Sequence, residues 1–327
     1  MDSDQRMKET FYNFHGVGIA ISGDEPVAAA VHSRFKQFPL ADRSEIDFTF
    51  DFCADPAAGN YVFDKPSGSA RPVYHPSVGE VVYYRGTDQL YIDHEGIRAL
   101  CNLREKHVRV TARECGRNNL WLLSHPMVTL PLIELLKRHG RYNIHAAGLC
   151  VNGKGLLVAG SSGSGKSTLT VALLRGGFGF LADDMGFLNA GPDGLRVFAF
   201  PDEIDLTDET AALFPELHHL LSSPKSPGWP KRQIRAEEVY PVETVWECKP
   251  AVLILPRIAN TDKSVLKRAD PGEALLELTP NILLTEPGSS QEHLDILTRL
   301  VNESDCYRLE TGRDFESIPQ LLRELVE

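Results

Sequence analysis

The feature that most constrains the fold is a glycine-rich turn between two apolar segments. The apolar run Leu156 to Ala159 predicts a strand, and Lys166 to Arg175 predicts an amphipathic helix that ends at Gly176-Gly177. Between them lies a stretch that matches the phosphate-loop pattern G-x-x-x-x-G-K-[ST] at every fixed position: Gly160-Ser161-Ser162-Gly163-Ser164-Gly165-Lys166-Ser167. Thr168 follows it. A Ser/Gly linker is the alternative, but a linker would not lie between an apolar strand and an amphipathic helix.

This loop predicts binding of a nucleoside triphosphate such as ATP, together with Mg²⁺. Glycines allow successive backbone N–H groups to converge on phosphate oxygens, and the helix that begins at Lys166 presents its positive end. We expect Lys166 to bridge the β- and γ-phosphates and the Ser167 hydroxyl to bind the metal. The residues expected to contact nucleotide run from Gly160 to Thr168.

Two adjacent carboxylates follow the loop. Asp183 and Asp184 lie at the end of the predicted strand Phe178 to Asp183, and the intervening helix would return that strand to the side of the loop. One carboxylate can organise Mg²⁺ while the other accepts a proton from an attacking hydroxyl. A solvated strand end is the alternative. The chain has no L-S-G-G-Q signature, which disfavours a transport ATPase.

The order and spacing of a histidine, the loop and the aspartate pair carry a family resemblance. Taken alone, His145 on a predicted strand over Ile144 to Val151 is typical of an ordinary core or surface histidine. The stretch from Ile144-His145-Ala146-Ala147-Gly148 through the loop to Leu181-Ala182-Asp183-Asp184 resembles the catalytic domain of HPr kinase/phosphorylase. Pro201 to Thr210 and Leu253 to Arg257 resemble later segments of the branch that includes lasso-peptide precursor kinases. The resemblance is strong over residues 144–185, weak over 186–327 and absent before about 125.

The resemblance implies a phosphoenolpyruvate-carboxykinase-like α/β P-loop core and phosphorylation of a serine in a protein or peptide. It assigns Asp184 as the base, His145 as an active-site partner near the phosphates, Lys166 to the phosphates, and Ser167 and Asp183 to the metal. A second metal carboxylate falls closest to Glu209, with Glu203 and Asp205 competing, and Glu209 is equally typical of a helix first turn. The R-G-x-G signature of the phosphate-removing reaction is missing, so neither that reaction nor HPr as substrate is implied.

Several basic residues are candidates for stabilising the transferred charge. Lys231, Arg232 and Arg235 lie in a predicted loop over Ser222 to Arg235, and mobile basic loops serve this purpose in kinases. A solvated loop is the alternative. Lys249, at the entry of the next predicted strand, is a further candidate, and the sequence leaves the choice open.

The chain is expected to have two domains. Residues 1–125 predict a β-rich domain that holds the acceptor or mediates homo-oligomer assembly, with strands at Val17 to Ser22, Ile46 to Phe52, Val81 to Tyr84 and Leu90 to Asp93. Residues 126–327 predict the catalytic domain, which opens with a helix over Pro126 to Arg138 and has another over Asp208 to Leu221.

Composition excludes several classes of protein. The formal net charge is −11, with 34 basic against 45 acidic side chains, and it disfavours binding to nucleic acid. No run reaches the roughly 18 apolar residues of a membrane span, and no apolar segment follows the charged residues Met1 to Thr10. A cytoplasmic protein without a membrane partner is therefore expected. The six cysteines form no C-x-x-C pair and are expected to be reduced.

Together these patterns predict an ATP- and Mg²⁺-dependent kinase with a hydroxyl acceptor. A serine of a protein or peptide is favoured by the resemblance. Two alternatives stay open: a kinase of small-molecule hydroxyls, which uses the same chemistry, and a regulatory switch that only hydrolyses the nucleotide.

Overall fold

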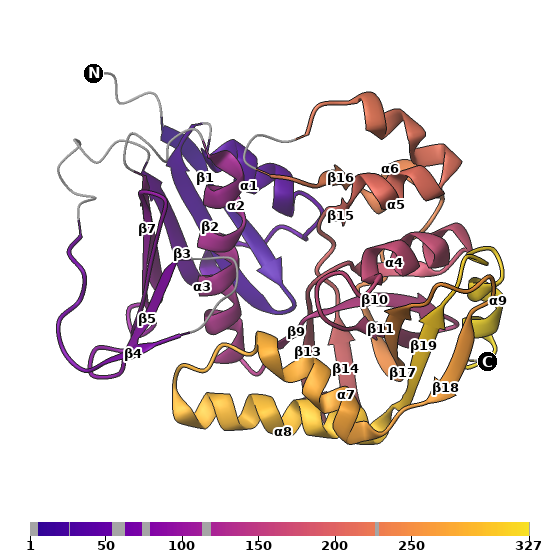
Figure 1. Cartoon of the computed structure of the whole chain (residues 1–327). Coiled ribbons are helices and arrows are strands. Elements are labelled where there is room, and N and C mark those ends of the chain that lie inside the picture. Colours follow the sequence, from indigo (N-terminus) through magenta and orange to yellow (C-terminus); the bar gives the residue numbers. More distant parts are fainter. Residues whose placement is uncertain are drawn as a thin grey trace. The chain divides into compact units, whose positions relative to one another are not determined.

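The computed structural model describes residues 6–25, 27–53, 63–73, 79–112, 119–225 and 229–326. These residues form a mixed α/β structure, as predicted, that divides into two compact units (Figure 1). Unit 1 comprises Met1–His139, Pro227–Trp229 and Leu283–Ser290, and unit 2 comprises Gly140–Ser226, Pro230–Ile282 and Gln291–Glu327. The assignment of a catalytic domain to residues 126–327 stays a prediction, because compactness does not define function.

Unit 1 is built on a sheet whose described strands follow the order β1-β2-β3-β8-β7-β6-β5-β4. The β2/β3 and β3/β8 pairs are parallel, and the other neighbours are antiparallel. Every second side chain of β3 enters the core, as Phe48, Phe50 and Phe52 show. The strands are β1 (Arg6–Phe14), β2 (Val17–Asp24), β3 (Ile46–Cys53), β4 (Ala70–Pro72), β5 (Glu80–Tyr84), β6 (Gln89–His94), β7 (Ile97–Asn102) and β8 (His107–Ala112).

Helices of unit 1 pack with this sheet. The helix α1 (Val27–Phe35) connects the parallel strands β2 and β3, and η1 (Arg43–Glu45) precedes β3. The ring of Phe14 on β1 lies 5.0 Å from that of Phe35 and 4.2 Å from that of Phe38, so aromatic contacts join α1 to the sheet. The unit also contains α2 (Leu120–Ser124) and α3 (Pro126–Lys137).

Unit 2 contains a second sheet, in which the described strands follow the order β12-β10-β11-β17-β14-β13-β9, with β19 pairing β17 and β18 pairing β19. The strands β15 and β16 form a separate pair. The bounds are β9 (Tyr142–Ile144), β10 (Ala146–Val151), β11 (Lys154–Ala159), β12 (Gly179–Ala182), β13 (Gly186–Gly191), β14 (Gly194–Phe198), β15 (Ile204–Leu206), β16 (Arg232–Ile234), β17 (Glu247–Ile258), β18 (Val265–Arg268) and β19 (Asp305–Thr311).

The helices of unit 2 vary widely in length. The longest, α8, begins with four residues that belong to unit 1. The helices are α4 (Lys166–Arg175), α5 (Asp208–Leu213), η3 (Pro215–Ser222), α6 (Ala236–Val239), α7 (Pro271–Leu278), η4 (Thr279–Asn281), α8 (Pro287–Glu303) and α9 (Ile318–Arg323).

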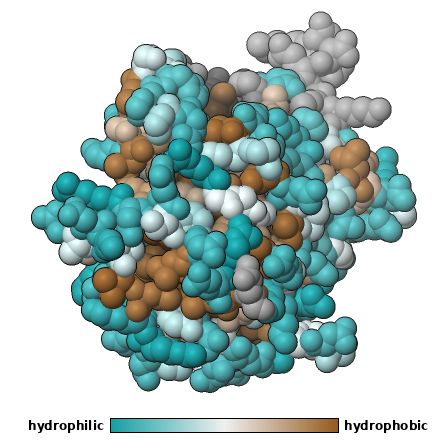
Figure 2. All heavy atoms as spheres, turned by 90° about the vertical axis from the view of Figure 1, so that its right-hand side faces the viewer, coloured by the Kyte–Doolittle hydropathy of each residue, from teal (hydrophilic) through white to brown (hydrophobic). Residues whose placement is uncertain are grey.

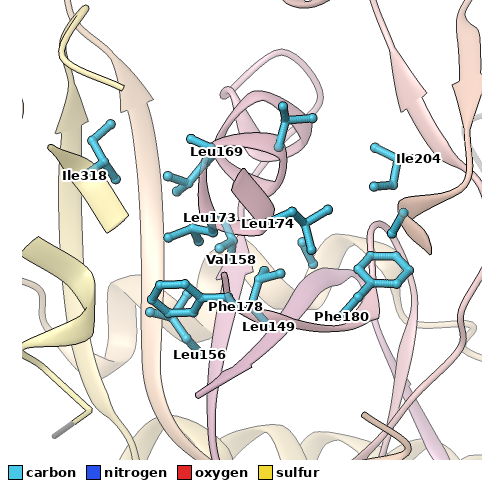
Figure 3. Packing of buried hydrophobic residues seen from close by; sticks show 14 of the residues in the cluster. Leu149, Leu156, Val158, Leu169, Leu173, Leu174, Phe178, Phe180, Ile204 and Ile318 are labelled. Carbon is cyan, nitrogen blue, oxygen red and sulfur yellow. The ribbon is translucent and has the colours of Figure 1, made fainter. Parts of the chain in front are cut away.

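The core of unit 2 holds the phosphate loop in place. Leu169, Leu173 and Leu174 of α4 belong to the same buried cluster as Leu156 and Val158 of β11 (Figure 3). Each fully buried leucine contributes about 1.5–3 kcal/mol relative to an exposed one. The strand before the loop and the helix after it are therefore both anchored in one apolar core.

The strand directions bring four strand ends to one edge of the sheet. The strands β11, β17 and β19 are mutually parallel. The strand β10 runs antiparallel to both β11 and β12, so β12 is also parallel to β11. The carboxyl ends of these four strands and the start of β10 consequently lie at the same edge, which is where open α/β sheets bind their ligands.

Three local predictions were wrong. The predicted strand Ile144 to Val151 is two strands, because the chain changes neighbours at His145: β9 pairs with β13, whereas β10 pairs with β11 and β12. The predicted helix Asp208 to Leu221 breaks between α5 and η3, where Phe214 is extended and Pro215 begins a new helix. The predicted loop Ser222 to Arg235 contains β16, which pairs with β15.

Cys53, Cys101, Cys150, Cys248 and Cys306 are buried and form no disulfide, and Cys115 lies outside the described residues. Within the described part of the chain, no helix is long and apolar enough to cross a membrane. On the face seen in Figure 2, hydrophobic side chains gather in patches among hydrophilic ones.

Candidate active site

The phosphate loop has the local geometry that its sequence predicts. Gly163 and Gly165 adopt φ values of +82° and +100°, a region that side-chain-bearing residues rarely adopt. The second of these glycines is the N-cap of α4, so the helix begins at Lys166. The backbone amides of the first turn of α4 therefore face the space enclosed by the loop.

The Lys166 side chain lies inside the loop and is 8% exposed. Its Nζ donates a hydrogen bond of 2.8 Å to the carbonyl oxygen of Gly160 and a longer one of 3.5 Å to that of Ser161. The ammonium group is thus held by carbonyls of the loop itself, at the point where a bound phosphate group would meet it.

Asp183 lies directly behind the loop. The Ser167 hydroxyl donates a 3.1 Å hydrogen bond to Asp183 Oδ2, and Asp183 is only 3% exposed. Burial raises the pKa of Asp183 to about 7, helped by the charges of Asp184 and Asp205 and opposed by hydrogen bonds from Ser167 and Thr170. Its Oδ1 atom is buried and makes no hydrogen bond within the described residues.

Asp184 points the other way and meets His145. Its side chain is 65% exposed, and its Oδ1 lies 3.5 Å from His145 Nε2. Burial lowers the pKa of His145; the carboxylate of Asp184 opposes this shift, and the positive charges of Lys166 and Lys231 add to it. The structure therefore brings together His145, Lys166, Ser167, Asp183 and Asp184.

The environment of Glu209 differs from that of these five residues. It is exposed in the first turn of α5, where its own backbone amide and the Thr207 hydroxyl lower the pKa of its carboxyl. That is the behaviour of a first-turn helix residue. Among Glu203, Asp205 and Glu209, the carboxylate whose charge raises the pKa of Asp183 is Asp205, on β15.

Thr168 contacts α5 rather than pointing only into the loop. Its hydroxyl lies 2.8 Å from that of Thr210, whose backbone amide is capped by Thr207. This contact ties the first turn of α4 to the first turn of α5.

The four basic residues considered as helpers of phosphate transfer differ in what they contact. Arg232 is buried, bonds to Asp208 at 2.7 Å and donates to two backbone carbonyls, and Arg235 bonds to Glu203 at 2.5 Å. Both therefore organise the surrounding chain. Lys231 is the one of the four whose charge acts on His145.

Lys249 lies at the wrong end of the sheet. In the parallel pair β11/β17 it stands opposite Lys154, at the start of β11, whereas the loop follows the other end of that strand at Ala159. Five residues of strand span roughly 16 Å. Lys249 is therefore not the basic residue that assists at the loop.

A cavity of about 320 Å³ adjoins the loop and includes residues that sequence patterns did not single out. Its walls combine the loop residues with the end of β17, one side chain of α7 and one of β19: Leu255, Pro256, Arg257, Ile258, Glu277 and Arg308. Arg257 ends the stretch Leu253 to Arg257 that carries part of the family resemblance. No sequence pattern points to Glu277 or Arg308, because they come from distant segments of the chain.

The residues behind the loop suit a hard divalent cation. A buried carboxylate oxygen of Asp183 without a hydrogen-bond partner, the Ser167 hydroxyl and the charge of Asp205 supply oxygen donors and negative charge. Mg²⁺ prefers such oxygen ligands. The donor set at this place is therefore compatible with the metal that the motif implies.

Comparison with known proteins gives partial matches. No family model matches the chain. It is 38% identical over 77 residues to HPr kinase/phosphorylase of Bordetella pertussis, covering 22% of this chain and 25% of that protein. It is 35% identical over 86 residues to HPr kinase/phosphorylase of Burkholderia cenocepacia, covering 24% and 27%. The matched part thus spans about a quarter of these relatives.

A solved structure of the HPr(Ser) kinase/phosphatase from Coxiella burnetii is similar at 14% identity and a TM-score of 0.31, covering 56% of this chain and 93% of that one. This TM-score is too low to support an argument about shared fold. The sequence matches are the stronger finding, and they agree with the resemblance predicted from the motifs. Over about a quarter of its length, the chain is similar to the HPr kinase/phosphorylases.

Proposed function

We propose that this protein is an ATP- and Mg²⁺-dependent kinase that phosphorylates a hydroxyl group, most favourably a serine of a protein or peptide. The proposal includes a phosphoenolpyruvate-carboxykinase-like arrangement of the P-loop core in unit 2. Location in the cytoplasm, homo-oligomer formation and nearness to the lasso-peptide precursor kinases stay predictions.

One observation carries the proposal: two adjacent aspartates at one strand end have opposite environments beside the loop. Asp183 is buried and bonded to Ser167, whereas Asp184 is exposed and lies 3.5 Å from His145. A switch that only hydrolyses nucleotide has no need of an exposed carboxylate paired with a histidine. A kinase needs both a metal-side carboxylate and an accessible base.

The roles follow from these positions. Lys166 and the loop amides would hold the triphosphate, while Ser167, Asp183 and Asp205 would hold Mg²⁺, with Asp205 in place of Glu209. The metal would neutralise charge on the phosphates. The hydroxyl oxygen of the acceptor would bond to the γ-phosphorus while the bond between that phosphorus and the β–γ bridging oxygen breaks. Asp184 would take the proton that the hydroxyl loses.

His145 and Lys231 would complete this arrangement. The imidazole, whose pKa is lowered by burial, would orient Asp184 through the 3.5 Å contact. The lysine would supply positive charge on the acceptor side. The class of acceptor rests on the relatives, which are HPr kinases by name, and the chain matches only a quarter of their length.

The direct test follows γ-phosphate from radiolabelled ATP in a cell lysate and, separately, in a metabolite fraction. We expect label on a polypeptide serine with the wild type and none with Lys166→Ala, whose loop cannot hold the phosphates. Label on a metabolite would establish a small-molecule kinase instead. Free phosphate as the sole product from both fractions would establish a hydrolase and refute the kinase proposal.

A further inference from the structure

The cavity beside the loop lies on the side away from the aspartates. In the sheet order, β12 and β10 stand on one side of β11, and β17 and β19 stand on the other. Asp183 and Asp184 follow β12, and His145 precedes β10. The cavity walls come instead from the loop, β17, α7 and β19. The loop therefore has an acidic side and a separate hollow side.

This division limits how a triphosphate can lie in the loop. If its γ-phosphate meets Ser167 and the aspartates, its other end must leave the loop on the hollow side. A volume of about 320 Å³ is at the lower end of the roughly 300–1,000 Å³ of small-molecule pockets. The space is thus of the right order for a base and a ribose and too small for a folded peptide segment.

The chemistry of the walls matches such a group. Ile258 is 66% exposed at the rim and lies next to Gly165, where a Cβ atom would be 3.4 Å from the isoleucine side chain. An exposed apolar side chain in contact with the loop offers a surface for a flat heterocycle. Glu277 is half-buried in the cavity wall and is an acceptor for hydroxyl groups.

Arginines supply the complementary charge. Arg308 and Arg257 both line the cavity, and the first is held in place by Glu273, whose Oε2 lies 3.1 Å from its Nη2. In a chain of net charge −11, two guanidinium groups beside the loop form a local site for an anion. They suit the α-phosphate, which joins the nucleoside to the rest of the triphosphate.

Resting on the proposed function, we propose that this cavity binds the nucleoside half of the triphosphate. Ile258 packs against the base, Glu277 accepts hydrogen bonds from the ribose hydroxyls, and Arg257 and Arg308 face the α-phosphate. The subsite determines affinity for the nucleotide without taking part in phosphoryl transfer.

The test compares a ligand that has a nucleoside with one that lacks it. Binding of ATP and of inorganic tripolyphosphate, each with Mg²⁺, is measured by calorimetry for the wild type, Ile258→Ser and Glu277→Gln. Leu276→Ser is the control, because Leu276 is 72% exposed and does not line the cavity. We expect each cavity variant to weaken ATP binding about tenfold, a typical effect of one lost contact, and to leave tripolyphosphate binding and the control unchanged.

Other outcomes are equally decisive. ATP affinity that is unchanged in both cavity variants, or losses that are equal for the two ligands, would overturn the nucleoside subsite while leaving the loop assignment intact. Failure of the wild type to bind either ligand would overturn the nucleotide site and the subsite with it. ATP binding with the expected pattern but without phosphate transfer would support the subsite and refute the kinase proposal alone.

Discussion

Asp183 and Asp184 are chemically identical neighbours that their surroundings make different. Asp183 is buried against Ser167, and its pKa is raised to about 7, whereas the carboxylate of Asp184 is largely in solvent beside His145. Both residues directly follow β12, yet one side chain is bonded to Ser167 of the loop and the other is exposed. The two residues are therefore expected to fail in different ways when mutated.

Asp184→Asn keeps the shape of the side chain but removes the base, so phosphate transfer should fall by about 10²–10⁴-fold while nucleotide binding is retained. Asp183→Asn should instead raise the Mg²⁺ concentration needed for half-maximal activity, because it removes a charged metal ligand. Calorimetric nucleotide titration and transfer assays over a magnesium series measure both effects. Full transfer by Asp184→Asn would remove the base assignment, and equal loss of nucleotide binding in both variants would reduce the pair to a metal site.

The pKa of His145 should lie below the ordinary histidine value of about 6.5, because burial disfavours the imidazolium. NMR titration of its ring protons measures this. Asp184→Asn should lower the pKa further by removing an attractive charge, and Lys231→Met should raise it by removing a repulsive one. Shifts of the same sign in both variants would contradict the electrostatic arrangement.

The same shift has a consequence for stability. A group with a lowered pKa in the folded state binds fewer protons folded than unfolded, so its contribution is present above pH 6.5 and is lost as pH falls through the folded pKa. His145→Gln should therefore reduce the loss of unfolding free energy between neutral and mildly acidic pH. Urea unfolding at several pH values tests it, and an unchanged pH slope would contradict the expectation.

At the scale of elements, the strand β9 positions His145, because β9 ends at Ile144, the residue before this histidine. Two side chains of α8 hold this short strand. His293, which is fully buried, lies with its Nε2 2.7 Å from the carbonyl oxygen of Asn143, and the Tyr142 hydroxyl donates to Glu292 at 2.6 Å. The strand is also paired with β13, which follows the aspartates. The helix α8 therefore supports the position of His145 through the backbone.

His293→Leu removes a buried donor and leaves the Asn143 carbonyl unsatisfied, which costs about 1–3 kcal/mol. Because β9 would shift, the turnover number should fall while the KM for ATP stays constant, and the His145 NMR signals should move. His293→Gln retains an N–H donor and should restore much of the activity. Tyr142→Phe removes the other bond between β9 and α8, the one to Glu292, and comparison with it separates the contribution of His293 from that of Tyr142. A KM increase with unchanged turnover would refute the positioning role.

At the scale of the whole molecule, unit 1 includes a short segment, Leu283–Ser290, that is remote from the rest of it in sequence. A buried polar network inside unit 1 holds this segment. Lys137 Nζ lies 2.8 Å from Glu134 Oε2 and donates to the hydroxyl of Thr285 at 2.8 Å and to the carbonyl oxygen of Leu283 at 3.1 Å. Burial lowers the pKa of Lys137, and the charge of Glu134 opposes this.

Lys137→Met removes the buried ammonium group that faces Glu134, whose carboxylate still has Arg138 at 3.1 Å, so the free energy of unfolding should fall by about 1–3 kcal/mol. Replacing both charges in Lys137→Met/Glu134→Leu should recover most of that loss, because an apolar pair carries no desolvation penalty. Urea unfolding of the two variants and the wild type provides the measurement. A double variant that is less stable than Lys137→Met would contradict this expectation, because it would show that Glu134 stabilises the fold by more than its pairing with Lys137.

The amino-acid sequence by itself determined the local parts of this protein. The glycine-rich loop between β11 and α4 was predicted because its chemistry depends on neighbours along the chain. The same holds for α3 and for the strands β2, β3, β5 and β6 of unit 1. Short-range steric and hydrogen-bonding preferences are enough to specify such elements.

Only the tertiary structure decided which distant residues meet. Strand order and direction bring His145 into contact with Asp184. They also bring the charge of Asp205, rather than that of Glu209, close to Asp183, and they place Lys249 at the far end of the sheet. The cavity formed with Glu277 and Arg308 depends on them as well. These relations come from pairings between strands and packing between elements far apart in the chain, which no local pattern of residues encodes.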